Sequence, residues 1–360
     1  MKSIAYFISP HGFGHAARAA AIMAALQQLD PEFCFEIYTL IPEWFFSESL
    51  TGPFHYHSLK TDIGLIQSSP LAEDAEATLN ALDQFLPFSQ QYIQQVACKL
   101  TENHCQYTIC DISPLGILAG KTAGTPTVLI ENFTWDWIYE NYLQEHPGFA
   151  KHIAYLHNIF QTPDIHILAQ PYCQSDPDAD LVARPISRAR KTTPQSVRAD
   201  LGINKGEKMI LVTMGGIPES FQSIGHLRKY KNTVFVIPGG AQKFTRIKNL
   251  ILLPHHSDFY HPDLINACDA AVGKAGYSTI AELYNAGIPF GYFSRDSFRE
   301  SAFLTAFIET NMPGIEMQSK HISDPEWLNQ IPDLLTLSRA HREQPNGAVQ
   351  VAQFLLQRFP

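Results

Sequence analysis

The chain has 360 residues, of which 45% are hydrophobic and 17% are charged, and its formal net charge is −9. This length suits two domains better than one core, and the acidic balance argues against a broad nucleic-acid-binding surface. No stretch approaches the length of a membrane span. The six cysteines are scattered without a C-x-x-C pair, which favours reduced thiols over a disulfide framework or a zinc site. We therefore expect a soluble, cytoplasmic protein.

Short apolar segments alternate with helix-forming segments through the first half of the chain. This alternation is typical of a parallel sheet that is covered by helices on both faces. The predicted strands are residues 3–9, 33–40, 54–59, 107–112, 125–132 and 164–169, and the predicted helices are residues 15–29, 72–102, 115–124, 135–144 and 148–161.

A second series of alternating segments follows the polar stretch 187–196. It predicts strands at 209–216, 232–240, 249–254, 269–276 and 288–294, with helices at 219–230 and 278–287, before a closing amphipathic helix. The sequence therefore predicts an α/β fold with two doubly wound, Rossmann-like domains that face a cleft. The expected domains are residues 1–184 and 185–345, with the helix in 346–360 packing back on the first domain.

In parallel sheets, ligands bind beyond the carboxyl ends of the strands, so the turns from strand to helix are the candidate sites. The first turn reads "PHGFGHAAR", and Gly14 lets its backbone approach a ligand closely. His15 stands at the head of the next helix, where the positive end of the helix dipole disfavours the imidazolium form. We predict that His15 is a general base, with capping or packing as the alternative. His11 is a candidate contact for substrate, and Arg18 either contacts an anionic ligand or braces the turn.

Two loops of the second series have the composition of an anion site. Gly215 and Gly216 end one strand and can present backbone N–H groups to a phosphate, although a plain tight turn is equally compatible. The stretch "VGKAGYSTIAEL" carries a more specific pattern of hydroxyls and a carboxylate. Its candidates for a nucleoside diphosphate are Lys274, Gly276, Ser278 and Thr279 for the phosphates and Glu282 for the ribose hydroxyls.

Charged residues also crowd the end of the following strand, in "YFSRDSFRES". Arg295, Asp296 and Glu300 are predicted to contact a polar ligand such as sugar hydroxyls, with a solvated salt-bridge loop as the alternative. The polar cluster "SDPDAD" is interpreted as a turn rather than a metal site, because of its proline and its position in a loop. The cluster "LPHHSDFYHPDL" is interpreted as a loop that leads toward the nucleotide base, because zinc would need a fourth ligand and no cysteine is near.

These motifs resemble those of the GT-B glycosyltransferase superfamily. The segments "HGFGHAAR", "GKAGYSTIAE" and "FSRDSFRESAFL" are similar to the glycosyltransferase-like N-terminal segment of plant arabinose kinases. The likeness to the bacterial cell-wall N-acetylglucosaminyltransferase is more distant. The resemblance implies a UDP-linked nucleotide-sugar donor held by residues 185–345, and an acceptor recognised by residues 1–184. It also implies that no metal or other cofactor is needed.

Carried over by position, the resemblance gives His15 the role of base in an inverting transfer. It assigns Gly276, Ser278 and Thr279 to the diphosphate and Glu282 to the ribose. Glu131 and Asn132 fall at a loop on the acceptor side. The predicted function is transfer of a sugar to an unknown acceptor. A sugar-nucleotide hydrolase or epimerase, and a nucleotide-sugar-binding module without chemistry, remain as alternatives.

Overall fold

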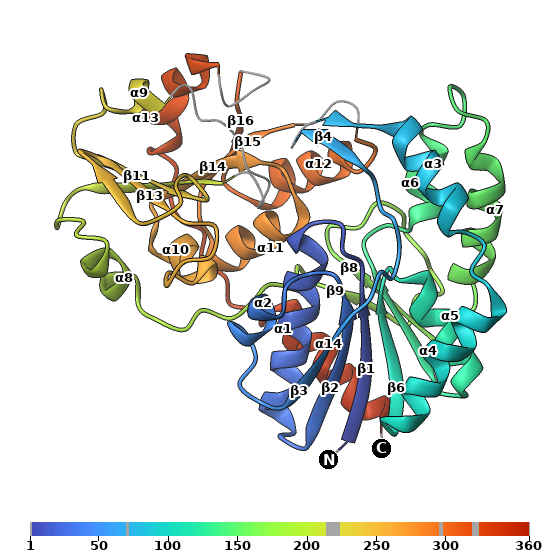
Figure 1. The fold of residues 1–360 in the computed structure, drawn as a ribbon. Coiled ribbons are helices and arrows are strands. Elements are labelled where there is room, and N and C mark those ends of the chain that lie inside the picture. Colours follow the sequence, from blue (N-terminus) through green and yellow to red (C-terminus); the bar gives the residue numbers. More distant parts are fainter. Residues whose placement is uncertain (1, 70–71, 214–223, 295–297, 319–323, 360) are drawn as a thin grey trace. The chain divides into compact units, whose positions relative to one another are not determined.

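The computed structural model describes residues 2–69, 72–213, 224–294, 298–318 and 324–359, and the chain forms two compact units. Unit 1 comprises Met1–Ser68, Ala72–Ser187 and Pro345–Pro360, and Arg188–Gln344 make up the body of unit 2. Each unit contains a seven-stranded sheet with helices along it (Figure 1). The predicted α/β architecture with two doubly wound sheets is therefore confirmed.

Unit 1 is built on a parallel sheet with the strand order β3-β2-β1-β6-β7-β8-β9. The chain moves outward from β1 to β3 and then resumes on the other side of β1. The neighbours β1 and β6 therefore form the topological switch point, where the loops after two adjacent strands diverge and leave room for a ligand. The strands are β1 (Lys2–Ile8), β2 (Phe33–Thr39), β3 (Phe54–Ser58), β6 (Cys105–Asp111), β7 (Thr127–Glu131), β8 (Ile165–Ala169) and β9 (Leu181–Ala183); β4 (Gln67–Ser69) and β5 (Ala72–Glu73) pair separately.

Helices cover both faces of this sheet, as right-handed crossovers in the two directions from β1 require. Figure 1 shows α1 on one side of β1 and β6, and α4 and α5 on the other. The helix α14 contacts both α1 and β9, although it comes last in the sequence. The helices of unit 1 are α1 (Phe13–Leu29), α2 (Glu43–Ser47), α3 (Ala75–Phe85), α4 (Gln90–Glu102), α5 (Pro114–Ala123), α6 (Trp135–Glu140), α7 (Phe149–Phe160) and α14 (Gly347–Arg358).

The prediction of one long helix over residues 72–102 was wrong. The structure has β5 at its start and then two helices, α3 and α4, which are separated by the segment around Pro87. Proline has no backbone N–H and disfavours helical geometry at the residue before it, so the helix ends at Phe85. Ser89 then caps α4 by accepting a hydrogen bond from the backbone N–H of Tyr92.

Unit 2 repeats the arrangement of unit 1 with the strand order β12-β13-β11-β10-β14-β15-β16. Its switch point lies between β10 and β14, and α11 follows β14. Among the described strands of unit 2, only β12 runs antiparallel to its neighbour. The elements are β10 (Lys208–Thr213), β11 (Thr233–Pro238), β12 (Thr245–Ile247), β13 (Leu250–Leu253), β14 (Ala270–Lys274), β15 (Phe290–Phe293), β16 (Gly314–Glu316), α8 (Pro194–Asp200), α9 (Ile224–Leu227), α10 (His261–Ala267), α11 (Tyr277–Ala286), α12 (Ser301–Asn311), the 3-10 helix Pro325–Gln330 and α13 (Ile331–Leu334).

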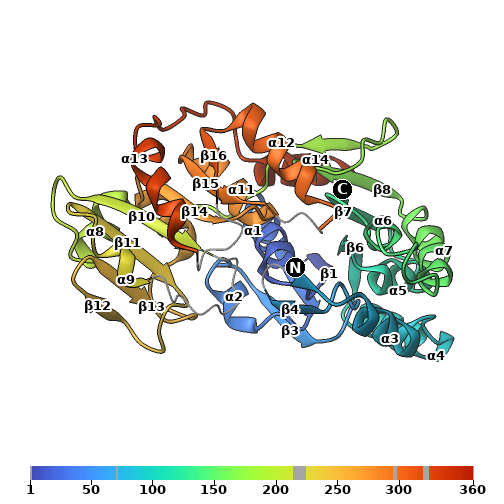
Figure 2. The same ribbon diagram turned by 90° about the horizontal axis from the view of Figure 1, so that it is seen from above.

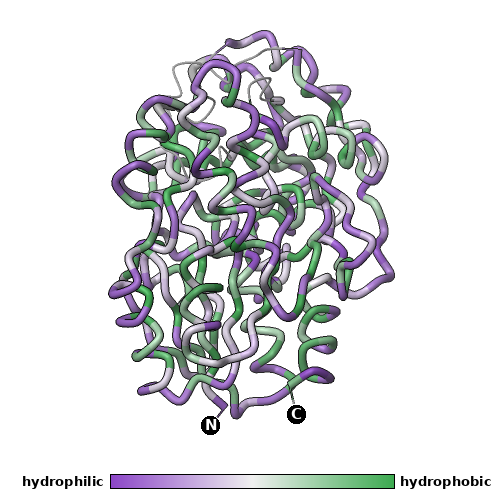
Figure 3. Tube along the Cα trace, turned by 90° about the vertical axis from the view of Figure 1, so that its right-hand side faces the viewer, coloured by the Kyte–Doolittle hydropathy of each residue, from purple (hydrophilic) through white to green (hydrophobic). Residues whose placement is uncertain are grey.

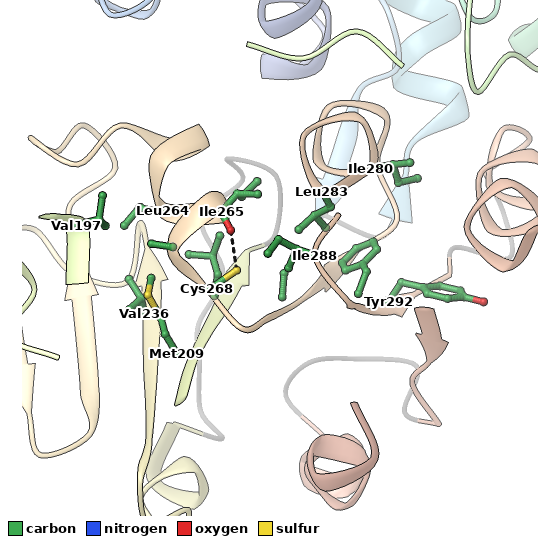
Figure 4. Packing of buried hydrophobic residues seen from close by; sticks show 14 of the residues in the cluster. Val197, Met209, Val236, Leu264, Ile265, Cys268, Ile280, Leu283, Ile288 and Tyr292 are labelled. Atoms are coloured by element: carbon green, nitrogen blue, oxygen red, sulfur yellow. Dashed lines mark hydrogen bonds between the residues drawn. The ribbon is translucent and has the colours of Figure 1, made fainter. Parts of the chain in front are cut away.

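Two apolar clusters fill the faces of the unit 2 sheet. One joins the sheet to α8, α10, α11 and α12, and Figure 4 shows Ile265, Leu283 and Ile288 meeting in it. The other joins the sheet to α9, the 3-10 helix and α13 through Trp327 and Ile331, among others. Figure 2 accordingly shows α11 and α12 on the other side of β14–β16 from α13. In Figure 3 the trace alternates between hydrophobic and hydrophilic stretches, and hydrophilic residues occupy many of its outer turns.

Candidate functional site

Some of the predicted residues lie at the switch point of each sheet. In unit 1, α1 follows β1, and its first turn carries His15, which lies beside Asp111 at the end of β6. Gly12 precedes α1 with φ +73°, a left-handed conformation that glycine adopts without strain, and a Cβ there would meet nothing within 4 Å. The backbone of this turn is therefore open to close approach by a ligand.

His15 forms a tight pair with Asp111. The imidazole Nδ1 lies 2.8 Å from Asp111 Oδ1, and both residues are buried, with 7% and 0% exposure. The N-cap position of α1 is held by Gly12, and the side chain of His15 pairs with Asp111. Helix capping therefore does not explain the position of His15. Within the described part of the chain, His15 Nε2 has no hydrogen-bond partner. This pairing is that of an imidazole oriented by a carboxylate, with its second nitrogen free to take a proton.

The guanidinium of Arg18 braces this pair from one turn further along α1. Its Nε and Nη2 donate to the two oxygens of Asp111, each at 2.7 Å, and its Nη1 donates to Asn132 Oδ1 at 2.7 Å. Arg18 is 1% exposed. This arrangement favours the bracing role that sequence analysis left open over a direct contact with an anionic ligand.

The charge of Arg18 also fixes the proton of His15. Burial alone would raise the pKa of Asp111, but the charge and hydrogen bonds of Arg18, together with the hydrogen bond from His15, hold it below its ordinary value. Asp111 is therefore an anion at neutral pH and accepts the His15 Nδ1 proton. A neutral His15 thus carries its proton on Nδ1 and its lone pair on Nε2.

Asn132 lies directly after β7, and only one of its two side-chain polar atoms has a hydrogen-bond partner among the described residues. Its Oδ1 accepts from Arg18, whereas its Nδ2 is buried without a partner among the described residues. A buried amide donor without a partner costs free energy, which a hydroxyl or carbonyl of a ligand would recover. This fits the predicted position of Asn132 on the acceptor side.

Aromatic rings line the same site. The Trp135 ring lies 5.2 Å from the His11 ring and 6.2 Å from the His15 ring, between centroids. Phe133 stands edge-on to His15 at 5.9 Å. Trp135 is the first residue of α6 and is 1% exposed. Its ring packs against the two histidines and is too buried to stack on a ligand. His11 accepts a hydrogen bond from the Leu65 backbone N–H at its Nδ1, 3.3 Å away.

Sequence reasoning missed Asp62, a second buried carboxyl group beside the first. Its Oδ1 accepts a hydrogen bond from Ser9 Oγ at 2.9 Å, and Ser9 directly follows β1. Burial raises the pKa of Asp62 to about 7, and the negative charge of Asp111 adds to this, despite the hydrogen bonds from Ser9 and Thr61. Asp62 lies in a loop without a motif, so only the fold brings it to the switch point.

Glu131 does not share the environment of Asn132. Its Oε1 lies 3.0 Å from Nε2 of His166 on β8, and the Nδ1 of His166 lies 3.0 Å from Asp176. Burial would lower the pKa of His166, but the two carboxylates outweigh it and raise the pKa. The carboxylate of Glu131 is therefore engaged in a network that ties β7 to β8.

In unit 2, α11 begins after a glycine. Its N-cap is Gly276, which has no side chain to accept a hydrogen bond from the N–H groups of the first turn. Ser278 and Thr279 occupy this turn, and their hydroxyls make no hydrogen bond within the described residues. Uncapped N–H groups with hydroxyls beside them form the kind of seat that binds a phosphate.

Glu282 lies one turn further along α11 and is 4% exposed. Its Oε1 accepts from Arg188 Nε at 3.1 Å, and its Oε2 lies 2.9 Å from His261 Nδ1. Burial would raise the pKa of Glu282, but Arg188 and His261 more than offset burial, so the pKa is lowered. The carboxylate is therefore an anion that already has a partner on each oxygen. A ribose hydroxyl would have to use the remaining lone pairs.

Of the other predicted contacts, two lie in the described part of the chain and four lie outside it. Lys274 ends β14, and Glu300 is the buried N-cap residue of α12. A Cβ on Gly276 would have only the Lys274 side chain and carbonyl nearby, at 3.7 Å or more, so the backbone is accessible there. Four further candidates lie outside the described residues: Gly215, Gly216, Arg295 and Asp296.

Gly273, the first glycine of the same loop, has a packing role. A Cβ at this position would lie 2.0 Å from the carbonyl oxygen of Thr213 on β10. Gly273 therefore allows β14 to pair closely with β10.

Comparison with known proteins gives one curated relative. A search of protein-family models finds none that matches this chain. The L-arabinokinase of Arabidopsis thaliana is 26% identical over 361 residues, which cover 98% of this chain and 34% of the relative. The chain thus spans about a third of the length of the curated relative that it matches.

Solved structures of glycosyltransferases match this chain along almost its whole length. The glycosyltransferase SnogD of Streptomyces nogalater matches with a TM-score of 0.59 and 13% identity, covering 100% of each chain. MurG of Acinetobacter baumannii matches with a TM-score of 0.55 and 14% identity, covering 99% of this chain and 100% of MurG. UGT2 of Phytolacca americana matches with a TM-score of 0.59 and 11% identity, covering 100% of each chain. From its two doubly wound sheets and these matches, we conclude that the chain has the fold of the GT-B glycosyltransferases.

Proposed function

We propose that this protein is a glycosyltransferase that uses a nucleotide sugar, preferably UDP-linked, as its donor. The observation that carries the proposal is the His15–Asp111 pair at the switch point of unit 1, with His15 Nε2 left without a partner among the described residues. The solved UGT2 structure contains UDP-2fluoro-glucose and pterostilbene, and a solved structure of the spinosyn rhamnosyltransferase SpnG contains thymidine diphosphate. These ligands support a nucleotide sugar as the donor class.

In the proposed reaction His15 Nε2 removes the proton from an acceptor hydroxyl. The hydroxyl oxygen forms a bond to the anomeric carbon of the donor sugar, and the bond from that carbon to the diphosphate oxygen breaks. The diphosphate leaves with the electron pair, and attack opposite to it inverts the anomeric centre. Asp111 keeps the imidazole oriented and stabilises the imidazolium that forms.

Unit 2 supplies the groups for the donor in this proposal. The open N–H groups of α11 and the Ser278 and Thr279 hydroxyls stabilise the negative charge that develops on the departing diphosphate. Glu282 orients the ribose through lone pairs that Arg188 and His261 leave available. The proposal assigns no step to a metal or other cofactor.

The His15→Ala variant tests the proposed base. We expect turnover to fall by about 10²- to 10⁴-fold, the usual contribution of a positioned general base, while nucleotide binding measured by thermal shift is retained. His341→Ala serves as a control, because His341 is an exposed histidine of unit 2. Unchanged turnover in His15→Ala would remove His15 as the base.

The donor and the reaction type are tested with the unmodified protein. A thermal-shift screen of UDP, GDP and TDP compounds identifies the nucleotide, because a ligand stabilises the native state according to its concentration and dissociation constant. Incubation with the selected nucleotide sugar, with and without candidate acceptors, then separates the reactions. Nucleotide release that depends on an acceptor supports transfer, whereas equally fast release without one supports a hydrolase.

A further inference from the structure

A second cluster of reactive side chains lies at the opposite end of the unit 1 sheet from His15. Cys34 and Glu36 belong to β2, and His55 belongs to the neighbouring edge strand β3, where it is the register partner of Glu36. Cys34 pairs with Ser3, near the start of β1, whereas Ser9 and His15 follow its end. Six residues of strand separate the two ends, which is about 20 Å. The cluster is therefore independent of the proposed transfer reaction.

The fold brings three different ligand types together in this cluster. One ligand atom each from Cys34, Glu36 and His55 lies within 4.8 Å of the other two. Cys34 and Glu36 stand two residues apart on one strand, so their side chains share a face of the sheet. The cross-strand partner His55 is on the same face, and its Nδ1 lies 2.7 Å from Glu36 Oε1.

The second oxygen of Glu36 is held from the other side. Its Oε2 lies 2.6 Å from His57 Nε2 and accepts a hydrogen bond from Asn103 Nδ2 at 3.0 Å. The His57 ring in turn stacks on Tyr38, with the two centroids 4.4 Å apart. Such contacts orient the carboxylate and leave Oε1 facing His55, as the outer partners of metal ligands commonly do.

We propose that Cys34, Glu36 and His55 form a binding site for a zinc-class divalent cation. A thiolate, a carboxylate and an imidazole are all ligands of Zn²⁺, and three protein ligands leave the fourth tetrahedral position for water. Bonds of about 2.0–2.3 Å place tetrahedral ligand atoms roughly 3.3–3.7 Å apart, so the three groups need only small shifts. Cys34 releases its proton to solvent on binding.

Exposure gives the ion a route to the site and lets the ligands adjust. The side chain of His55 is 65% exposed, so it can rotate and can receive an ion from solvent, whereas that of Glu36 is 6% exposed and fixed. The bound ion would link β3 to β2 across the edge of the sheet. The proposed site therefore stabilises the edge of the unit 1 sheet and takes no part in the proposed reaction.

Cobalt(II) tests the site, because a cysteine thiolate bound to Co²⁺ gives a charge-transfer absorption that imidazole and carboxylate ligands do not. We expect this band in the unmodified protein at one equivalent, its displacement by Zn²⁺, and its loss in Cys34→Ser. Cys98→Ser is the matched control, because Cys98 is an exposed cysteine of α4 outside the cluster, and this variant should keep the band. Absence of the band from the unmodified protein, or its persistence in Cys34→Ser, would overturn the proposal.

A second variant guards against misfolding of Cys34→Ser, since Cys34 is buried. His55→Gln changes an exposed side chain and should leave the fold intact by circular dichroism. We expect it to weaken Zn²⁺ binding in calorimetry by tenfold or more and to abolish the rise in melting temperature that Zn²⁺ causes. Equal Zn²⁺ affinity in His55→Gln and the unmodified protein would also refute the site.

Discussion

Asp62 and Asp111 show how one site holds two carboxyl groups in different protonation states. Both are buried, at 5% and 0% exposure, but only Asp111 faces a guanidinium. The pKa of Asp111 is lowered by Arg18 and His15 in spite of its burial, whereas burial raises the pKa of Asp62 to about 7. Neighbouring groups whose pKa values are pushed apart in this way take different roles in proton transfer.

The raised pKa of Asp62 predicts a specific dependence of stability on pH. Between about pH 4 and pH 7 the native state holds a proton on Asp62 that the unfolded chain has lost, so stability falls as pH rises through this window. The difference between a pKa of about 7 and an unfolded value near 4 corresponds to on the order of 4 kcal/mol.

The Asp62→Asn variant should lack this dependence. Its free energy of unfolding in urea, relative to the unmodified protein, should therefore be higher at pH 8 than at pH 5. Asp178→Asn, which changes an exposed aspartate, should follow the unmodified protein at both values. An offset between Asp62→Asn and the unmodified protein that is the same at pH 5 and pH 8 would contradict the shift.

At the level of single residues, motif spacing identified the residues that stand on turns and missed those that tertiary structure brings in. His15 and Arg18 are named by "HGFGHAAR", but Asp111 and Asp62 come from distant segments without a motif. The cluster of Cys34, Glu36 and His55 was overlooked for the same reason. Alternate residues of one strand and a register partner on another resemble no zinc spacing until the strand pairing is known.

Among the helices and strands, α11 matters most for the proposed donor site, because no N-cap side chain covers its N-terminus. Ser278 is its second residue, beside the uncapped N–H groups of the first turn. A carboxylate at this position would act in opposite directions on folding and on binding. It would interact favourably with the helix dipole, by about 0.3–1 kcal/mol, yet it would repel a diphosphate.

Ser278→Asp is therefore expected to keep or raise the melting temperature while it weakens UDP binding, measured by calorimetry, by tenfold or more. Ser278→Ala removes the hydroxyl without adding charge and should weaken binding only modestly. If UDP binds Ser278→Asp as well as it binds the unmodified protein, the diphosphate does not sit at this helix.

Secondary structure was predicted well where the pattern was local and poorly where it was not. Strands that are buried on both faces contain few polar residues, so continuous apolar runs predicted them correctly. These strands are β1, β6, β7, β10 and β14. The boundary between α3 and α4 was missed, since the residues on both sides favour helices and the break is confined to residues 86–89, where Pro87 disfavours a helix. The roles of Gly215, Gly216, Arg295 and Asp296 stay predictions.

Considered as a whole, the chain leaves unit 1 for unit 2 and returns to unit 1 at its end. The returning segment is α14, where Val351, Ala352 and Leu355 are each 0% exposed and the helix contacts α1. Asn346 secures the return, because its side chain accepts from the Ala348 N–H and donates to the carbonyl of Ser187, at 2.9 and 2.7 Å.

Leu355→Ala should lower the free energy of unfolding of unit 1 by about 2–5 kcal/mol, as large-to-small changes in a core usually do. Gln353→Ala, on the exposed side of the same helix, should change it by less than about 0.5 kcal/mol. Hydrogen exchange resolved by peptide locates the effect. Amides of β1 and α1 should exchange faster in Leu355→Ala, and those of β10 and β14 should not. Faster exchange throughout unit 2 as well would show that α14 supports both units.

The late position of α14 in the chain also sets an order of events during synthesis. Every residue of Arg188–Gln344 is translated before the helix that completes the first sheet's cover. Unit 1 therefore lacks α14 until unit 2 has been translated, and until then α1 exposes the apolar surface that α14 covers. Nascent chains halted just before Pro345 should therefore bind chaperones through unit 1, the part that is synthesised first.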